Sequence, residues 1–128
     1  MTISTLDVTI PVQDIEYRYW GDVMSKKALE ILTESMFYVL ISLLSGEKCG
    51  TEISAFVAER TAGRVTLGPG TLYTILSKFE DEKLIRETMV EGRRRTYAIT
   101  ARGRDMYRAE LERLRACIRD AEAAERGD

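Results

Sequence analysis

The stretch from Leu67 to Ile85, LGPGTLYTILSKFEDEKLI, constrains the fold most, because it predicts a helix with two unlike faces. Its apolar residues recur at i, i+3, i+4 and i+7, which is the spacing of one helical stripe. These residues are Leu72, Ile75, Leu76 and Phe79. The opposite face carries small groups, hydroxyls and one cation: Gly70, Tyr73, Thr74, Ser77 and Lys78. Such a segment could be an ordinary amphipathic surface helix, or a helix that packs on a domain while its polar face enters a DNA major groove.

Composition bounds the class of protein. The 128 residues are 45% hydrophobic and 31% charged, as in one soluble globular domain with or without an extension. No apolar run reaches the ~20 residues that span a bilayer, and the N-terminus does not resemble a signal peptide. Cys49 and Cys117 lack metal-ligand spacing, so we interpret both as reduced thiols of a cytoplasmic protein.

The chain contains no histidine. This removes the commonest general base, the usual partner of a Ser or Cys nucleophile, and most zinc sites. No Asp/Glu pair is framed by residues typical of a pocket. We therefore expect the protein not to be an enzyme, and we expect neither a metal nor a cofactor.

The charge is segregated along the chain, although the net charge is only −2. Between Arg64 and Arg104 there are nine Lys/Arg against five Asp/Glu, whereas the rest has ten against sixteen. The segment that holds the two-faced helix is thus basic within an acidic chain, and the overall charge is a poor guide to its partners.

An N-terminal extension, residues 1–32, precedes the main pattern. Its first twelve residues alternate briefly, as an edge strand or a loosely held arm would, and a mostly helical pattern follows from Asp14. The aromatic residues Tyr17, Tyr19 and Trp20 form one cluster. They could pack at a subunit interface or line a pocket for a small-molecule effector.

Three helices are predicted in sequence, as in a helix-turn-helix unit. Thr33 is a plausible N-cap for a helix over Met36–Leu44, which is apolar almost all round and is therefore expected to be buried on most sides. A second helix is expected over Gly50–Arg60, and Val65–Leu67 could make a brief extended pairing. The two-faced helix follows the turn at residues 68–70.

A two-stranded hairpin is predicted next, with strands at 84–90 and 95–100 around a turn at 91–94 that contains Gly92. Three consecutive arginines, at 93, 94 and 95, give this hairpin a basic tip. They could pair with Glu87 and Glu91 in a solvated turn. Because the hairpin directly follows the two-faced helix, we favour contact with DNA phosphates.

A long helix that Thr100 caps is predicted for the C-terminal part, with Gly103 allowing close packing on its neighbour. Its apolar residues repeat at spacings of 4, 3, 4 and 3, which is a short heptad seam. They are Tyr107, Leu111, Leu114, Ile118 and Ala121. The seam could pack within the subunit, but we favour a second copy, because a ~20-residue helix overhangs a core this small. The last eight residues are expected to fray.

The combination of MFYVLISLLSGEKCGTEI, LGPGTLYTILSKFEDEKLI and EGRRRTYAITARG resembles the PadR family of bacterial transcriptional regulators, over residues 36–114. The resemblance implies a mainly α fold with a small β-hairpin (α+β). It implies a winged helix-turn-helix DNA-binding domain over 33–100 and a dimerisation helix over 101–128. Residues 1–32 extend beyond the family's common core, and we expect this arm and helix to form part of the dimer interface. The resemblance also implies homodimers that bind partly palindromic operator DNA and repress transcription until a small hydrophobic or aromatic effector releases them.

The resemblance implies which residues contact DNA. The recognition-helix contacts fall on Gly70, Thr71, Tyr73, Thr74, Ser77 and Lys78, and the wing contacts on Arg93, Arg94 and Arg95. Two departures bear on the site. Cys49-Gly50-Thr51 stands where the family commonly has His-Gly-Tyr, and Lys83 stands where it usually has the glycine that ends the helix.

A second interpretation is a winged-helix protein-interaction module that does not bind DNA. The net acidity of the chain supports it, as does the run Glu80-Asp81-Glu82 at the end of the two-faced helix. Affinity for duplex DNA at low salt separates the two interpretations.

Overall fold

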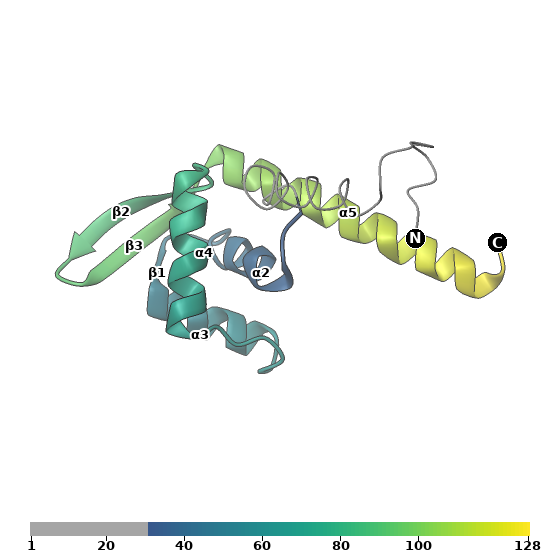
Figure 1. Ribbon diagram of the computed structural model, residues 1–128, viewed down its shortest axis with the longest axis horizontal. Helices are drawn as coiled ribbons and strands as arrows, with labels where there is room; N and C mark the ends of the chain where they lie inside the picture. Colours follow the sequence, from purple (N-terminus) through teal and green to yellow (C-terminus); the bar gives the residue numbers. More distant parts are fainter. Residues whose placement is uncertain (1–30) are drawn as a thin grey trace, which may run out of the picture. The chain divides into compact units, whose positions relative to one another are not determined.

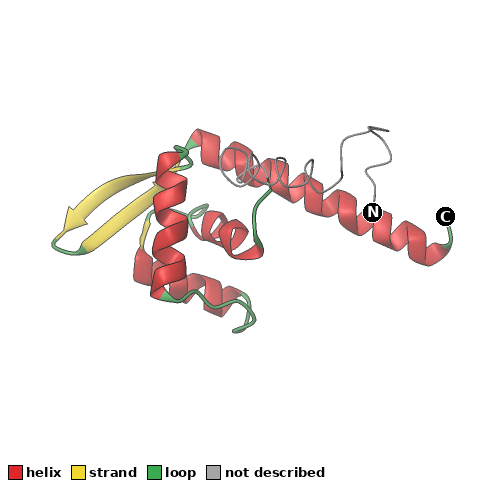
Figure 2. Ribbon diagram, viewed as in Figure 1, coloured by secondary structure: helices red, strands yellow, loops and turns green. Residues whose placement is uncertain are grey.

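The computed structural model describes residues 31–128, which Figure 1 shows in colour. In chain order the elements are α2 (Glu34–Ser42), β1 (Lys48–Cys49), α3 (Gly50–Arg60), α4 (Pro69–Asp81), β2 (Ile85–Glu91), β3 (Arg94–Ile99) and α5 (Ala101–Arg126). The strands form one antiparallel sheet in the order β1-β3-β2. Figure 2 shows that helices predominate around this small sheet. The expected mainly α fold with a β-hairpin, a winged helix-turn-helix followed by a long C-terminal helix, is confirmed.

A single apolar core joins the three helices of the helix-turn-helix to the base of the hairpin. Its fully buried side chains come from α2, α3, α4 and the start of the hairpin: Val39, Leu40, Leu43, Ile53, Val57, Leu76, Phe79 and Leu84. Burying each such side chain contributes about 1.5–3 kcal/mol, so this cluster holds α4 firmly against α3.

Helix α2 is less enclosed than its sequence suggests. Thr33 caps it as expected, because its hydroxyl accepts the Met36 N–H at 3.2 Å. Within the helix, however, only Val39, Leu40 and Ser42 are buried, so burial on most sides is not found in the described part of this chain. The helix ends at Ser42, and its remaining apolar residues (Met36, Phe37, Tyr38 and Ile41) are half-buried, although α3 and α5 both pack on the helix.

The sheet contains a third strand that the sequence pattern did not reveal. The two-residue β1 pairs with β3, with Lys48 opposite Tyr97 and Cys49 opposite Thr96. The extended pairing expected at residues 65–67 is wrong. That segment is a loop, held where the Thr61 hydroxyl accepts the Val65 N–H at 3.0 Å and lies 3.2 Å from the Val65 carbonyl oxygen.

The hairpin of β2, β3 and their connecting turn is called the wing below. Its turn is only two residues long, Gly92 and Arg93, and Gly92 takes a left-handed φ of +62°. An irregularity between Glu87 and Met89 leaves Thr88 unpaired in β2. Such a bulge increases the local twist of a hairpin.

Helix α4 ends without a glycine, as its sequence requires. Lys83 takes a left-handed φ of +64°, and the Leu84 N–H donates to the Phe79 carbonyl at 2.9 Å. This is the closing bond of a Schellman motif, which usually has glycine at the position that Lys83 occupies. The chain therefore turns directly from α4 into the wing.

Thr100 connects three elements at the start of α5. Its hydroxyl accepts the Gly103 N–H at 3.0 Å and donates to the Lys83 carbonyl at 2.7 Å. Its backbone N–H donates to the Leu84 carbonyl at 3.0 Å. The cap expected at Thr100 is confirmed, and it ties the end of α4 to the first turn of α5.

Helix α5 continues to Arg126, so the expectation that the last eight residues fray is wrong. Gly127 ends the helix in the left-handed conformation, with φ +83°, and Arg126 lies 3.0 Å from the Asp128 carboxylate. Within residues 31–128, no helix is both long and apolar enough to cross a membrane.

A buried carboxylate fixes the middle of α5. Glu110 is only 3% exposed, and its Oε2 accepts the Leu32 N–H at 3.2 Å. The Arg113 Nε donates to Oε1 of the same carboxylate at 2.8 Å. The charge is therefore paired and hydrogen-bonded, as buried charges require.

Candidate nucleic-acid interface

The two expected faces of α4 are confirmed. Leu72, Ile75, Leu76 and Phe79 are all buried, between 0 and 6% exposed. On the other face, Gly70, Thr71, Tyr73, Thr74 and Ser77 are exposed and Lys78 is half-buried. A stable apolar back thus presents small groups and hydroxyls to the outside, which is what close approach to a major groove requires.

The Thr74 hydroxyl is committed to its own helix. It donates to the Gly70 carbonyl at 2.8 Å, which leaves its oxygen lone pairs and its methyl group available on the surface. Thr74 can therefore accept a hydrogen bond or contact a thymine methyl group. Ser77, one turn further along the same exposed face, carries the next hydroxyl.

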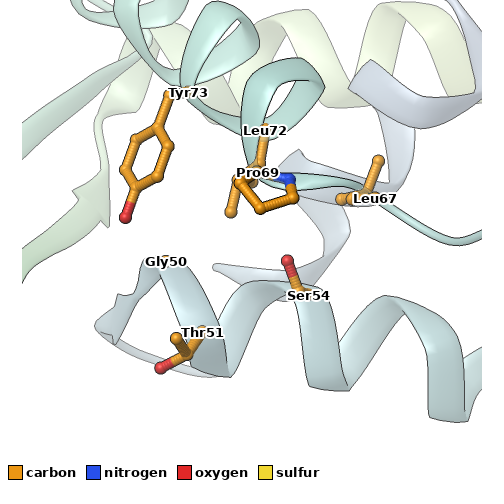
Figure 3. A pocket seen from close by; sticks show the side chains of 7 residues that line it. All are labelled: Gly50, Thr51, Ser54, Leu67, Pro69, Leu72 and Tyr73. Carbon is orange, nitrogen blue, oxygen red and sulfur yellow. The ribbon is translucent and has the colours of Figure 1, made fainter.

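Tyr73 does not simply project outward from α4. Figure 3 shows its ring reaching from α4 towards the first turn of α3. Its hydroxyl lies so close to Gly50 that a Cβ built on Gly50 would be only 3.3 Å from it. The side chain remains 52% exposed. Gly50 is thus a residue whose small size positions Tyr73, and this role was not predicted.

The first turn of α3 carries Glu52, whose carboxylate caps the start of the helix. Glu52 Oε1 accepts the Cys49 N–H at 2.9 Å. Hydrogen bonds from the backbone and side chain of Cys49, together with nearby Arg94 and Lys48, hold the pKa of the Glu52 carboxyl below its ordinary value. Desolvation opposes this shift. Glu52 therefore stays ionised near the face that α4 presents.

The three arginines of the wing are all exposed at its end, but their side chains do not form one cluster. Arg93 lies in the turn, whereas Arg94 and Arg95 are neighbours on β3 and so point to opposite faces. Arg94 lies 3.6 Å from Glu52 of α3, and Arg95 lies 3.1 Å from Glu87 of β2. Within residues 31–128, the pair with Glu87 that the alternative interpretation gave is present, the pair with Glu91 is not, and Arg93 makes no ion pair. The alternation of side chains along a strand could have predicted that Arg94 and Arg95 point to opposite faces.

The wing lies beside α4. Figure 1 shows the wing and α5 on opposite sides of α4, and α3 beneath the N-terminal end of α4. The acidic residues 80–82 lie at the other end of α4, where Glu82 is 3.8 Å from Arg102 of α5. Thirteen helical residues, about 20 Å, separate the two ends. The acidic run is therefore remote from the end that packs on α3.

The seam of α5 is divided in two. Its first residue, Tyr107, stacks on Phe37 of α2 with ring centroids 5.6 Å apart, and Leu111 and Leu114 are half-buried. Further along, Ile118 is 59% exposed and Ala121 is exposed. The proximal part of the seam thus packs within the chain, while Ile118 and Ala121 of the distal part are exposed. The effector residues Tyr17, Tyr19 and Trp20 lie outside the described residues.

The sequence matches a known protein family and a related protein. The family model for the transcriptional regulator PadR-like family matches residues 39–109, more than half of the chain. A protein of Streptomyces fradiae, known as an uncharacterized 37.1 kDa protein in transposon TN4556, is 32% identical over 81 residues. The match covers 63% of this chain but spans only 23% of that relative's length.

Solved structures share the same architecture. A transcriptional regulator from Clostridium thermocellum superposes with a TM-score of 0.62 and 26% identity, over 68% of this chain and 88% of that one. Bacillus subtilis PadR, solved in complex with operator DNA, gives 0.53 and 22%, over 59% of this chain and 45% of that one. A PadR family regulator from Clostridium difficile gives 0.56 and 19%, over 75% and 100%. The last two likenesses, being under 25% identical, bear on the fold alone.

Proposed function

We propose that this chain, which belongs to the PadR-like family of transcriptional regulators, is a homodimeric DNA-binding repressor that acts in the cytoplasm. One observation carries the proposal: the exposed polar face of α4 is backed by a fully buried stripe and flanked by the wing. In this arrangement α4 is the reading helix and residues 33–100 form the DNA-binding domain.

Each side chain of the reading face has a role suited to its chemistry. Gly70 and Thr71 allow the first turn of α4 to approach the duplex closely. Tyr73, Thr74 and Ser77 reach base edges or phosphates, and Lys78 neutralises a phosphate. On the wing, Arg93 contacts the DNA backbone. Arg94 and Arg95 reach it by exchanging their carboxylate partners for phosphates.

The second copy packs against the distal part of α5. Ile118 and Ala121 are open there, and the half-buried side of α2 adds further apolar surface. Helix 101–128 is thus the dimerisation helix, and residues 1–32 complete the interface. In such a dimer the two α4 helices enter successive major grooves, about 34–36 Å apart along the duplex.

The wing contact is tested by the salt dependence of DNA binding. A labelled duplex carrying the gene's own upstream region is titrated by fluorescence anisotropy at several salt concentrations, with wild-type protein and Arg93→Ala. We expect weaker binding and a log–log salt slope smaller by about 2 per dimer, because each lost phosphate contact removes about 0.9 counterion. Arg119→Ala is the control, because Arg119 is an exposed arginine in the distal part of α5. Equal slopes for the two variants would contradict the wing contact.

The dimer is tested by sedimentation. Ile118→Glu places a charge in the proposed interface and is expected to raise the dimer dissociation constant at least about tenfold, because burying an unpaired charge is costly. Arg119→Glu, one residue further on, should change it little. A wild-type chain that stays monomeric at micromolar concentration overturns this part of the proposal.

Release by an effector is tested through Trp20, the only tryptophan in the chain. A small hydrophobic or aromatic effector that binds Tyr17, Tyr19 and Trp20 should change the tryptophan emission and weaken operator binding together.

The alternative function is a winged-helix protein-interaction module. It replaces the repressor if the wild-type protein has no duplex affinity even at low salt and forms a stable hetero-complex instead.

A further inference from the structure

A pocket opens between the first turns of α3 and α4, beside the reading face. Its volume is about 310 Å³, at the lower end of the range for small-molecule sites. The lining residues are Gly50, Thr51, Ser54, Leu67, Pro69, Leu72 and Tyr73. Figure 3 shows α3 below the opening and the side chains of α4 above it.

The walls of this pocket are mainly apolar and carry no charged side chain. Leu67, Pro69 and Leu72 supply aliphatic surface, and the ring of Tyr73 closes one side. An ionised ligand would lose its hydration here without gaining a counter-charge from the lining residues. The pocket therefore favours an uncharged occupant.

Two hydroxyls of the lining, one on α3 and one on α4, have no hydrogen-bond partner in the part of the chain that the structure describes. In Figure 3 the Ser54 hydroxyl is directed from α3 towards α4, and the Tyr73 hydroxyl from α4 towards α3. The third hydroxyl, on Thr51, lies 3.2 Å from the Cys49 sulfur and is directed away from the opening. Two available O–H donors in an apolar setting suit an acceptor such as a carbonyl oxygen.

We infer that this pocket binds a small uncharged apolar compound that carries a carbonyl acceptor, of the ketone, lactone or lactam class. Its apolar body fills the space between Leu67, Pro69 and Leu72, and its carbonyl accepts from the Ser54 hydroxyl. The consequence for DNA rests on the proposed function: because Tyr73 belongs to both the pocket and the reading face, the ligand and the operator compete.

The binding step is tested on the full-length protein with N-cyclohexyl-2-pyrrolidone, an uncharged lactam, by following backbone amide signals in NMR. We expect saturable shifts centred on Gly50, Ser54 and Tyr73, with a dissociation constant in the low millimolar range for a probe this small. Cyclohexanecarboxylate should bind more weakly. Tighter binding of the carboxylate overturns the preference for an uncharged ligand, and no saturable shift at these residues overturns the site.

Two variants of Ser54 distinguish the effect of filling the pocket on probe binding from the effect of removing the hydroxyl. Ser54→Leu fills the space and should abolish the shifts, whereas Ser54→Ala keeps the space and should weaken binding about two- to tenfold, the effect of one hydrogen bond. Ala55→Leu is the matched control, because Ala55 is the next residue of α3, is exposed and does not line the pocket. Equal binding by Ser54→Leu and Ala55→Leu overturns the location.

The competition step is tested separately with the labelled duplex. At a probe concentration ten times its dissociation constant, the apparent dissociation constant for DNA should rise at least about tenfold in the wild-type protein and in Ala55→Leu, because each subunit of the dimer carries one pocket. It should not rise in Ser54→Leu. Binding of the probe without this rise overturns the competition and leaves the site. Absence of DNA binding at every salt concentration overturns the proposed function, while the NMR titration still decides the site.

Discussion

Gly103, in the first turn of α5, packs directly against the backbone carbonyl of Leu84, at the point where α4 gives way to the wing. A Cβ at this position would overlap that carbonyl and would lie 2.7 Å from the Ile99 side chain. Backbone on one side and the half-buried Ile99 at the end of β3 on the other leave no room for even a methyl group. Gly103 is thus required for close packing, rather than for an unusual backbone conformation.

Gly103→Ala should therefore lower the free energy of unfolding by about 2–3 kcal/mol, the usual cost of overpacking a tight contact. Urea denaturation at one fixed protein concentration measures it. Gly70→Ala is the matched control, because Gly70 also lies in a helix and has nothing within 4 Å of the added carbon. That variant should be neutral or more stable by up to about 1 kcal/mol. Equal effects of the two substitutions would be inconsistent with the packing described here.

Lys83→Gly should stabilise the protein by about 0.5–1 kcal/mol. Lys83 holds a left-handed φ of +64°, which costs a residue with a Cβ but not glycine. The same denaturation experiment applies. Glu82→Gly, at φ −88°, provides the comparison and should be destabilising, because there glycine gives only extra freedom to the unfolded chain. A loss of stability in Lys83→Gly would show that the lysine side chain matters more than the backbone.

Glu110→Ala should lower the free energy of unfolding by about 2–3 kcal/mol. The substitution leaves the Leu32 N–H without its acceptor and Arg113 without its partner, and it empties a buried volume. Glu112→Ala serves as control, because Glu112 pairs with Arg115 on the solvent side, where such pairs contribute less than about 1 kcal/mol. The expectation fails if thermal and urea unfolding give the same small change for both variants.

The lowered pKa of Glu52 predicts a pH dependence of stability. A carboxyl whose pKa is lower in the folded than in the unfolded state stabilises the fold above its unfolded pKa. This contribution should therefore be present at neutral pH and be lost as the pH falls from about 4.5 through the folded pKa. NMR titration of the side-chain carboxyl measures the pKa directly. Glu52→Gln should be less stable than wild type at pH 7, and the difference should vanish well below pH 4.5.

The parts of the fold that were predictable are those set by local pattern. The buried stripe of α4 needs only the helical period of Leu72, Ile75, Leu76 and Phe79, and the span of α3 follows its apolar spacing. The wing follows from two β-favouring runs around Gly92. In each case the residues that decide the structure are within about ten positions of one another.

The parts that were missed depend on residues far apart in the chain. Strand β1 has two residues and so no period to detect, and it exists only because Thr96 and Tyr97 pair with it. Glu110 and Arg113 look like an exposed pair one helical turn apart, and the burial of Glu110 depends on Leu32, 78 positions away. The Tyr73 side chain was expected to project outward from α4, but it is directed towards Gly50 in α3 (Figure 3).

Thr100 has a mechanical consequence for any assembly of two chains. Its bonds to Lys83, Leu84 and Gly103, together with the close packing at Gly103, leave no joint between the end of α4 and the start of α5. In a dimer, α4 and α5 of each subunit would then move together as one rigid unit. A signal that alters the angle between paired α5 helices would swing both α4 helices bodily. The distance between the two α4 helices would change, while the structure of each helix would not. The affinity for operators with altered half-site spacing would therefore report the motion.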